Sequence, residues 1–156
     1  MGEIKIENKA FQDVWPEWGS NCWGCGRNNE HGLQIKSYWE GEEAVCIWQP
    51  ERYHEAYMGA LCGGIIATII DCHCTNTAVA AAYKAAEREL GSEPFLKYAT
   101  GSINIKLLRP ARTRKPVTLR AKVKEMKKSK ITVSCSLYYQ NKLCASGEIV
   151  VINLER

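Results

Sequence analysis

The chain has 156 residues, of which 46% are hydrophobic and 24% charged, and a formal net charge of +4. This length suits one domain with a buried core, and the composition excludes an intrinsically disordered chain. The small positive charge suits an anionic small molecule and falls short of the excess expected of a nucleic-acid-binding protein.

The N-terminal third is predicted to hold an irregular segment and then a hairpin. Residues 1–30 are rich in aromatic residues, glycine and proline, which indicates an irregular extension with turns. Two short strands follow over 33–39 and 43–49, joined by Glu40-Gly41-Glu42. A glycine in so short a loop is typical of a β-hairpin.

One long helix is predicted from Gly63 to about Arg88. Alanine is frequent in this segment, and Gly91 suits a C-terminal stop. The first half of the helix is apolar on every side. We therefore expect the rest of the protein to cover most of its circumference.

The C-terminal third is predicted to form four strands, over 99–108, 117–124, 131–139 and 143–154. Apolar and polar residues alternate along them, which buries one face of each strand and leaves the other in solvent. The order is thus hairpin, helix and four-strand meander. It predicts one α+β domain over residues 1–156, in which an antiparallel sheet of five or six strands wraps around one central helix.

Asp71 is the one formally charged residue between Glu55 and Lys84. Burying a carboxylate costs on the order of several kcal/mol unless it is paired or neutralised. One interpretation is structural, with Asp71 hydrogen-bonded to backbone or hydroxyl groups. The other is a catalytic base or nucleophile whose surroundings raise its pKa. Thr75 lies one turn further on the same face and could orient the carboxylate or a water molecule.

Gly63 and Gly64 favour the catalytic interpretation of Asp71. They leave the backbone N–H groups of the helix start unshielded, where the helix dipole is positive and an oxyanion could bind. Alternatively, they only allow close packing against a strand. The eight residues from Gly63 to Asp71 span about 12 Å of helix, so one carbonyl cannot contact both. A reaction that uses both needs two copies of the chain at a two-fold interface.

His73 and the cysteine pairs are interpreted structurally. His73 points to another side of the helix than Asp71, and we expect a core histidine satisfied by a backbone carbonyl. Cys22 and Cys25 form a Cys-x-x-Cys, but a zinc site needs about four ligands at suitable positions. Cys72 and Cys74 lie about 200° apart on a helix and cannot easily share a metal. We expect no metal site, and a Cys-x-x-Cys turn whose thiols pack.

The eight cysteines and the apolar stretches bear on the cellular compartment. A secreted disulfide framework would follow a signal peptide, and the opening MGEIKIENKAFQDVW has no apolar segment. The most apolar stretch, 56–70, is broken by three glycines and is too short to span a bilayer. We therefore expect a cytoplasmic protein with free thiols and no membrane partner.

Three segments resemble the PaaI-like acyl-CoA thioesterases of the hotdog-fold superfamily. They are NCWGCGRNNEHGL at 21–33, YHEAYMGALCGGIIATIIDCHCTNTA at 53–78 and INIKLLRPA at 103–111. The resemblance implies a homodimer, or a dimer of dimers, whose sheets join and whose helices pack together. It also implies an acyl-CoA substrate, with no cofactor other than the CoA that belongs to the substrate.

The resemblance assigns roles to residues of the helix. The acid at Asp71 would activate water or attack the thioester, and the N–H of Gly63 of the partner subunit would bind the carbonyl oxygen. His54, Cys62 and Gly64 would lie at the substrate. The family usually has histidine directly before the glycine pair, where this chain has Cys62.

A basic loop is the last candidate site, since Arg109, Arg112, Arg114 and Lys115 fall within seven residues. Clustered guanidinium groups bind phosphate well, and CoA carries three phosphates. A solvated loop without a ligand would have the same composition. The leading hypothesis is hydrolysis of an acyl-CoA thioester. The alternative is a non-catalytic acyl-CoA or lipid binder with the same fold.

Overall fold

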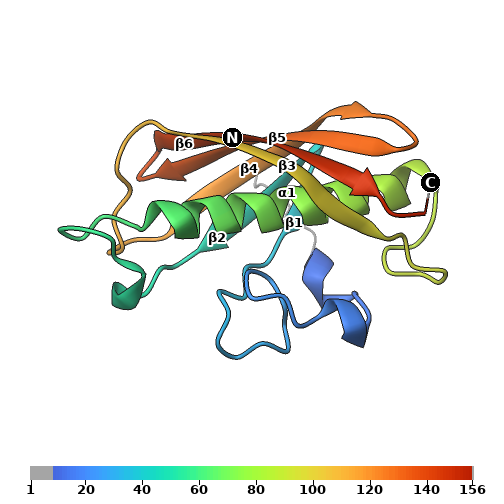
Figure 1. Ribbon diagram of the computed structural model, residues 1–156, viewed down its shortest axis with the longest axis horizontal. Helices are drawn as coiled ribbons and strands as arrows, with labels where there is room; N and C mark the ends of the chain where they lie inside the picture. Colours follow the sequence, from blue (N-terminus) through green and yellow to red (C-terminus); the bar gives the residue numbers. More distant parts are fainter. Residues whose placement is uncertain (1–8, 156) are drawn as a thin grey trace.

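The computed structural model describes residues 9–155, so that 1–8 and 156 of the predicted domain lie outside it. A six-stranded antiparallel sheet covers one long helix (Figure 1). The strands are β1 (Tyr38–Glu40), β2 (Glu43–Trp48), β3 (Tyr98–Leu107), β4 (Val117–Met126), β5 (Lys130–Tyr139) and β6 (Lys142–Asn153). The predicted α+β architecture, with an antiparallel sheet around one central helix, is confirmed.

The place of β3 differs from the predicted four-strand meander. The sheet order is β1-β2-β4-β5-β6-β3, so β3 pairs with β6 at the edge and β4 pairs with β2. The connection from β3 to β4 therefore crosses the sheet. Apolar alternation reports which face of a strand is buried and says nothing of its neighbour, so the pattern could not reveal this crossing.

The predicted strand over 33–39 is wrong except at its end. Leu33, Ile35 and Ser37 are buried, which produces the alternating pattern, but Gln34 has a left-handed backbone with φ of 52°. The backbone carbonyl of Leu33 accepts a hydrogen bond from Trp48 Nε1 at 2.9 Å. This stretch thus packs its alternate side chains inward without joining the sheet, and β1 begins only at Tyr38.

The helix α1 (Gly63–Ala85) ends three residues earlier than predicted, and Glu87 after it has a left-handed backbone with φ of 54°. Figure 1 shows α1 between the sheet and the N-terminal segment. The helix has the length and hydropathy of a membrane span, but 61% of its most apolar window is buried within the protein. A core helix covered on two sides has these properties.

The N-terminal segment, residues 9–32, is irregular as predicted, with the short 3₁₀ helices η1 (Phe11–Asp13) and η2 (Glu17–Gly19). Beside it, the fully buried His73 donates from Nε2 to the Ala44 carbonyl at 3.0 Å and accepts from the Ser37 hydroxyl at 2.7 Å. Complete burial lowers the pKa of His73 to about 4. The interpretation of His73 as a satisfied core histidine is confirmed.

Candidate functional site

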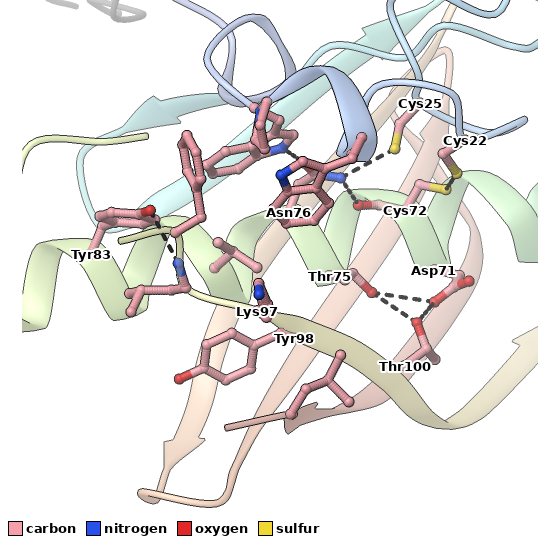
Figure 2. Close-up of a pocket in the computed structure, with 18 residues that line it drawn as sticks. Cys22, Cys25, Asp71, Cys72, Thr75, Asn76, Tyr83, Lys97, Tyr98 and Thr100 are labelled. Carbon is pink, nitrogen blue, oxygen red and sulfur yellow. Dashed lines mark hydrogen bonds between the residues drawn. The ribbon is translucent and has the colours of Figure 1, made fainter. Parts of the chain in front are cut away.

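A cavity of about 340 Å³ opens beside the middle of α1, between the helix, the N-terminal segment and β3 (Figure 2). Most of its walls are aromatic or aliphatic. Trp15 stacks on Tyr83 with ring centroids 6.2 Å apart, and Trp18 meets Phe95 edge-on at 6.0 Å. A largely apolar cavity of this size suits the apolar part of a small ligand.

Asp71 lies half-buried in the wall of this cavity. Its Oδ1 accepts a hydrogen bond from Thr100 Oγ1 at 2.7 Å and a longer one from Thr75 Oγ1 at 3.4 Å, and the two hydroxyls are 3.0 Å apart (Figure 2). Burial raises the pKa of the Asp71 carboxyl, while the hydrogen bonds from Thr100 and Thr75 oppose that rise. The carboxylate is thus held in one orientation at the edge of an apolar space.

Thr100 is the part of this group that sequence reasoning missed. It comes from β3, whose pairing with β6 shifts register between Thr100 and Ser102. A β-carbon at Gly101 would overlap Ile152, so the bulge needs glycine there. An isolated glycine in a strand pattern indicates a bulge, and bulges are frequent beside active sites. Gly101 was therefore the signal in the sequence that could have pointed to Thr100.

Three thiols line the same cavity next to Asp71, from Cys22, Cys25 and Cys72. Their sulfur atoms all lie within 4.8 Å of one another. Hydrogen bonds from the thiols of Cys25 and Cys72 lower the pKa of Cys22. The prediction treated Cys22 and Cys25 as a packed turn and did not place Cys72 beside them.

Four other predicted site residues lie together at the start of α1 and are called the helix-start group. They are His54, Cys62, Gly63 and Gly64. Cys62 precedes the first helical residue, and its N–H donates to the His54 carbonyl at 2.9 Å. The His54 ring packs 5.1 Å from the Trp48 ring and accepts the Glu51 N–H at 2.8 Å. Among residues 9–155, none of this group lines the cavity beside Asp71.

The basic loop lines a second depression, of about 570 Å³, together with Met58 and Lys142. Its residues there are Arg109, Arg112, Arg114 and Lys115. Arg112 Nη1 donates to the Met58 carbonyl at 2.6 Å, and the Leu61 N–H donates to the Ala111 carbonyl at 2.8 Å. These bonds attach the basic loop to the segment that leads into α1. The basic depression, called the basic groove below, therefore adjoins the helix-start group.

Several solved structures with the same fold are named as thioesterases. A thioesterase superfamily protein from Shewanella loihica PV-4 shares 32% identity, covering 81% of this chain and 96% of that one, at a TM-score of 0.64. A thioesterase from Haemophilus influenzae matches at 21% identity, 80% and 82% coverage and a TM-score of 0.63.

A putative thioesterase from Ralstonia eutropha JMP134, described as phenylacetic acid degradation-related, matches at 18% identity, 77% and 85% coverage and a TM-score of 0.62. At such identities, the Haemophilus and Ralstonia proteins show the fold alone. No protein-family model and no curated protein matches the chain.

Proposed function

Since the chain belongs to the hotdog-fold thioesterase superfamily, we propose that it is a PaaI-like enzyme that hydrolyses acyl-CoA thioesters to a free acid and CoA. The observation that carries this proposal is the place of Asp71. Its carboxylate is fixed by hydroxyls from α1 and β3 at the edge of an apolar cavity. An acyl group in that cavity would bring its thioester carbonyl to the carboxylate.

Asp71 acts on the thioester in one of two ways. As a base, it takes a proton from a water molecule while the water oxygen attacks the carbonyl carbon. As a nucleophile, it attacks that carbon itself, and water then hydrolyses the resulting anhydride. In both routes the carbonyl oxygen becomes an oxyanion, which re-forms the C=O bond as the C–S bond breaks. CoA leaves as a thiolate and takes up a proton, from Asp71 in the base route and from water in the nucleophile route. Thr100 and Thr75 keep the carboxylate aimed at the reacting atoms.

The oxyanion is bound by the N–H of Gly63 of the partner subunit, in a homodimer formed through β3. As an edge strand, β3 leaves one row of backbone groups available for pairing. It also exposes Ile103 by 50% and Leu107 by 60%. These two features favour the pairing of β3 with its copy in a second subunit, either in a dimer or in a dimer of dimers.

The positions along β3 support a site shared between subunits. Thr100 contacts Asp71, and a β-carbon at Gly63 would lie 3.0 Å from Leu107 Cδ1. In an antiparallel two-fold pair centred between Ile103 and Asn104, Thr100 faces Leu107 of the partner subunit. This pairing brings Asp71 of one protomer toward Gly63 of the partner subunit. Within one chain the two residues are about 12 Å apart along the helix, too far to contact the same carbonyl.

The basic groove completes the substrate site. It adjoins the helix-start group, so the protomer that supplies the Gly63 N–H also supplies arginines for the phosphates of CoA. The other protomer supplies Asp71 and the acyl cavity. A cavity of about 340 Å³ with aromatic walls favours medium-chain or aryl acyl groups over acetyl, because each additional Å² of buried apolar surface contributes about 25 cal/mol.

A panel of acetyl-, hexanoyl-, benzoyl- and phenylacetyl-CoA tests this function. Released CoA is measured by chromatography, because the exposed Cys22 would react with a thiol reagent. We expect turnover of the larger esters, and Asp71→Asn to lower kcat by about 10²- to 10⁴-fold with little change in binding. Asp13→Asn, at a surface salt bridge with Lys36, is the matched control.

Two results would contradict the proposal. One is the absence of CoA release from every ester. The other is an Asp71→Asn protein that binds acyl-CoA and turns over as fast as wild type. If wild type and Asp71→Asn bind the esters equally and neither releases CoA, the protein is the non-catalytic binder instead.

A further inference from the structure

The three-thiol cluster of Cys22, Cys25 and Cys72 is not used by the proposed hydrolysis. Cys22 and Cys25 come from the N-terminal segment, and Cys72 comes from α1, fifty residues away from Cys22 (Figure 2). The mutual sulfur distances are all within 4.8 Å, and Cys22 and Cys72 are 3.8 Å apart. Three potential thiolate ligands thus converge on one point of the cavity wall.

The sulfur separation of Cys22 and Cys72 agrees with the geometry of a zinc site. Zn–S bonds are about 2.3 Å long, so two thiolates on a tetrahedral zinc ion lie about 3.8 Å apart. That is the separation of Cys22 and Cys72. Thiolate ligands in a tetrahedral arrangement are the ones that zinc prefers. A disulfide, by contrast, would join only two of the three sulfurs.

Two glycines allow the turn that holds Cys22 and Cys25 to pack against Cys72. A β-carbon at Gly24 would overlap the Cys72 sulfur and lie 3.0 Å from Thr68 Cγ2. A β-carbon at Gly26 would overlap the backbone nitrogen of Cys22. Only glycine at these two places lets the Cys-x-x-Cys turn close tightly and rest on α1 at Cys72.

Asn76 supplies an outer hydrogen bond to the cluster. Its Nδ2 donates to Cys25 Sγ at 3.5 Å and to the Cys72 carbonyl at 2.7 Å. Trp15 Nε1 donates to the Asn76 side-chain oxygen, which fixes the amide with its NH₂ group toward the sulfur. Such partners orient metal ligands and stabilise their ionised form.

We propose that Cys22, Cys25 and Cys72 bind one Zn²⁺ ion, with the fourth coordination position facing the cavity. All three residues line that cavity, and the exposed Cys22 gives the ion a way in. Binding displaces the thiol protons and leaves three thiolates around one divalent ion. The ion joins the N-terminal segment to α1, and water or a ligand group from the cavity takes the remaining position.

Cobalt titration of the full-length protein tests the site. The protein is reduced, stripped of metal with a chelator and titrated with Co²⁺, which reports thiolate ligands by charge-transfer absorption and tetrahedral geometry by its visible bands. We expect one Co²⁺ per chain, displaced by one Zn²⁺, and a higher melting temperature with zinc. The Cys22→Ser and Cys72→Ser variants should each bind zinc at least about 100-fold more weakly.

Cys144→Ser is the matched control, because Cys144 is a buried free thiol on β6 outside the cluster, and it should bind metal as wild type does. Cys22 is exposed, so Cys22→Ser keeps the test valid if Cys72→Ser fails to fold. The proposal is overturned if reduced wild type binds no Co²⁺, or if Cys22→Ser binds it equally well. It is also overturned if mass spectrometry shows that a disulfide within the cluster, rather than bound metal, is what stabilises the protein. None of these readouts depends on turnover, so they are independent of the proposed hydrolysis.

Discussion

The hydroxyl of Thr100 lies 2.7 Å from Asp71 Oδ1, and this hydrogen bond joins the edge strand β3 to the middle of α1. Thr75 donates to the same oxygen from one turn further along the helix. Because both threonines contact Oδ1, Oδ2 is the oxygen that can accept a proton from water or attack a carbonyl carbon. The arrangement orients the carboxylate, and no cationic side chain among residues 9–155 forms a salt bridge with it.

Replacing Thr100 with valine should therefore slow the reaction. The Thr100→Val side chain keeps the shape and loses the hydrogen bond, and we expect kcat to fall about tenfold with little change in KM. Thr75→Val should have a smaller effect, since its bond to Asp71 is 3.4 Å long. Steady-state kinetics with the best ester of the panel measure both. Thr118→Val on β4 is the control, and a Thr100→Val enzyme with the kcat of wild type would contradict the positioning role.

The Gly63 N–H can be removed with little damage to the helix. Proline is tolerated at the first helical position, and Cys62 before it has the extended backbone that proline requires, with φ of −56° and ψ of 130°. We expect Gly63→Pro to lower kcat by about 10²- to 10³-fold, as for loss of an oxyanion donor. Gly63→Ala keeps the N–H and should lower kcat less than Gly63→Pro does. Its methyl group must still displace the tip of Leu107.

Mixing two inactive variants tests whether the site is shared between subunits. A dimer of one Gly63→Pro chain and one Asp71→Asn chain has one site with both groups intact and one with neither. Unfolding and refolding the two variants together should therefore restore activity that neither shows alone. If the mixture stays inactive while mixed dimers are detected by mass spectrometry, Asp71 and Gly63 do not act across the interface.

The dimer should depend on the exposed face of β3. Ile103→Asp introduces a charge on the edge strand, which we expect to prevent pairing and to lower activity with it. Light scattering after gel filtration would then give half the mass of the wild-type assembly, which is the 17.6 kDa monomer if wild type is a dimer. Ile47→Asp, on β2 and 59% exposed, is the matched control and should remain dimeric. Loss of the dimer in both variants, or in neither, would count against β3 as the interface.

The basic groove should affect only substrates that carry phosphates. Arg114→Ala is expected to raise KM for an acyl-CoA on the order of tenfold, because a charge-assisted contact is lost. KM for the same acyl group on N-acetylcysteamine, which lacks phosphates, should stay the same. Lys128→Ala, in the turn between β4 and β5, is the control. Equal KM changes for both substrates would mean that Arg114 has a structural role.

Local patterns in the sequence predicted the elements of the fold well. The strands β2, β4, β5 and β6 and the start of α1 follow from alternation and from the glycine pair, because burial of one face leaves a direct trace in the sequence. The same rule misled at 33–37, where alternate residues pack inward although the segment joins no ladder. Pairing of β3 with β6 leaves no such trace, since it depends on a contact between distant segments.

In the candidate site too, contacts between residues close in sequence could be predicted, and contacts between distant segments could not. Asp71 and Thr75 could be predicted together because they are four residues apart on one helix. The contact of Thr100 with Asp71 could not be predicted, and neither could that of Cys22 with Cys72. Each joins two segments that come together only in the folded chain. For this reason the sequence did not reveal that Cys72 lies beside Cys22 and Cys25.

The N-terminal segment forms one wall of the cavity through Trp15, Trp18 and Cys22, yet it contributes no strand to the sheet. One wall of the cavity thus comes from a segment outside the sheet, while α1 and the stretch that leads into β3 form most of the rest. If the proposed hydrolysis holds, substitutions in this wall should change which acyl groups are accepted while Asp71 and its hydrogen bonds to Thr75 and Thr100 stay in place.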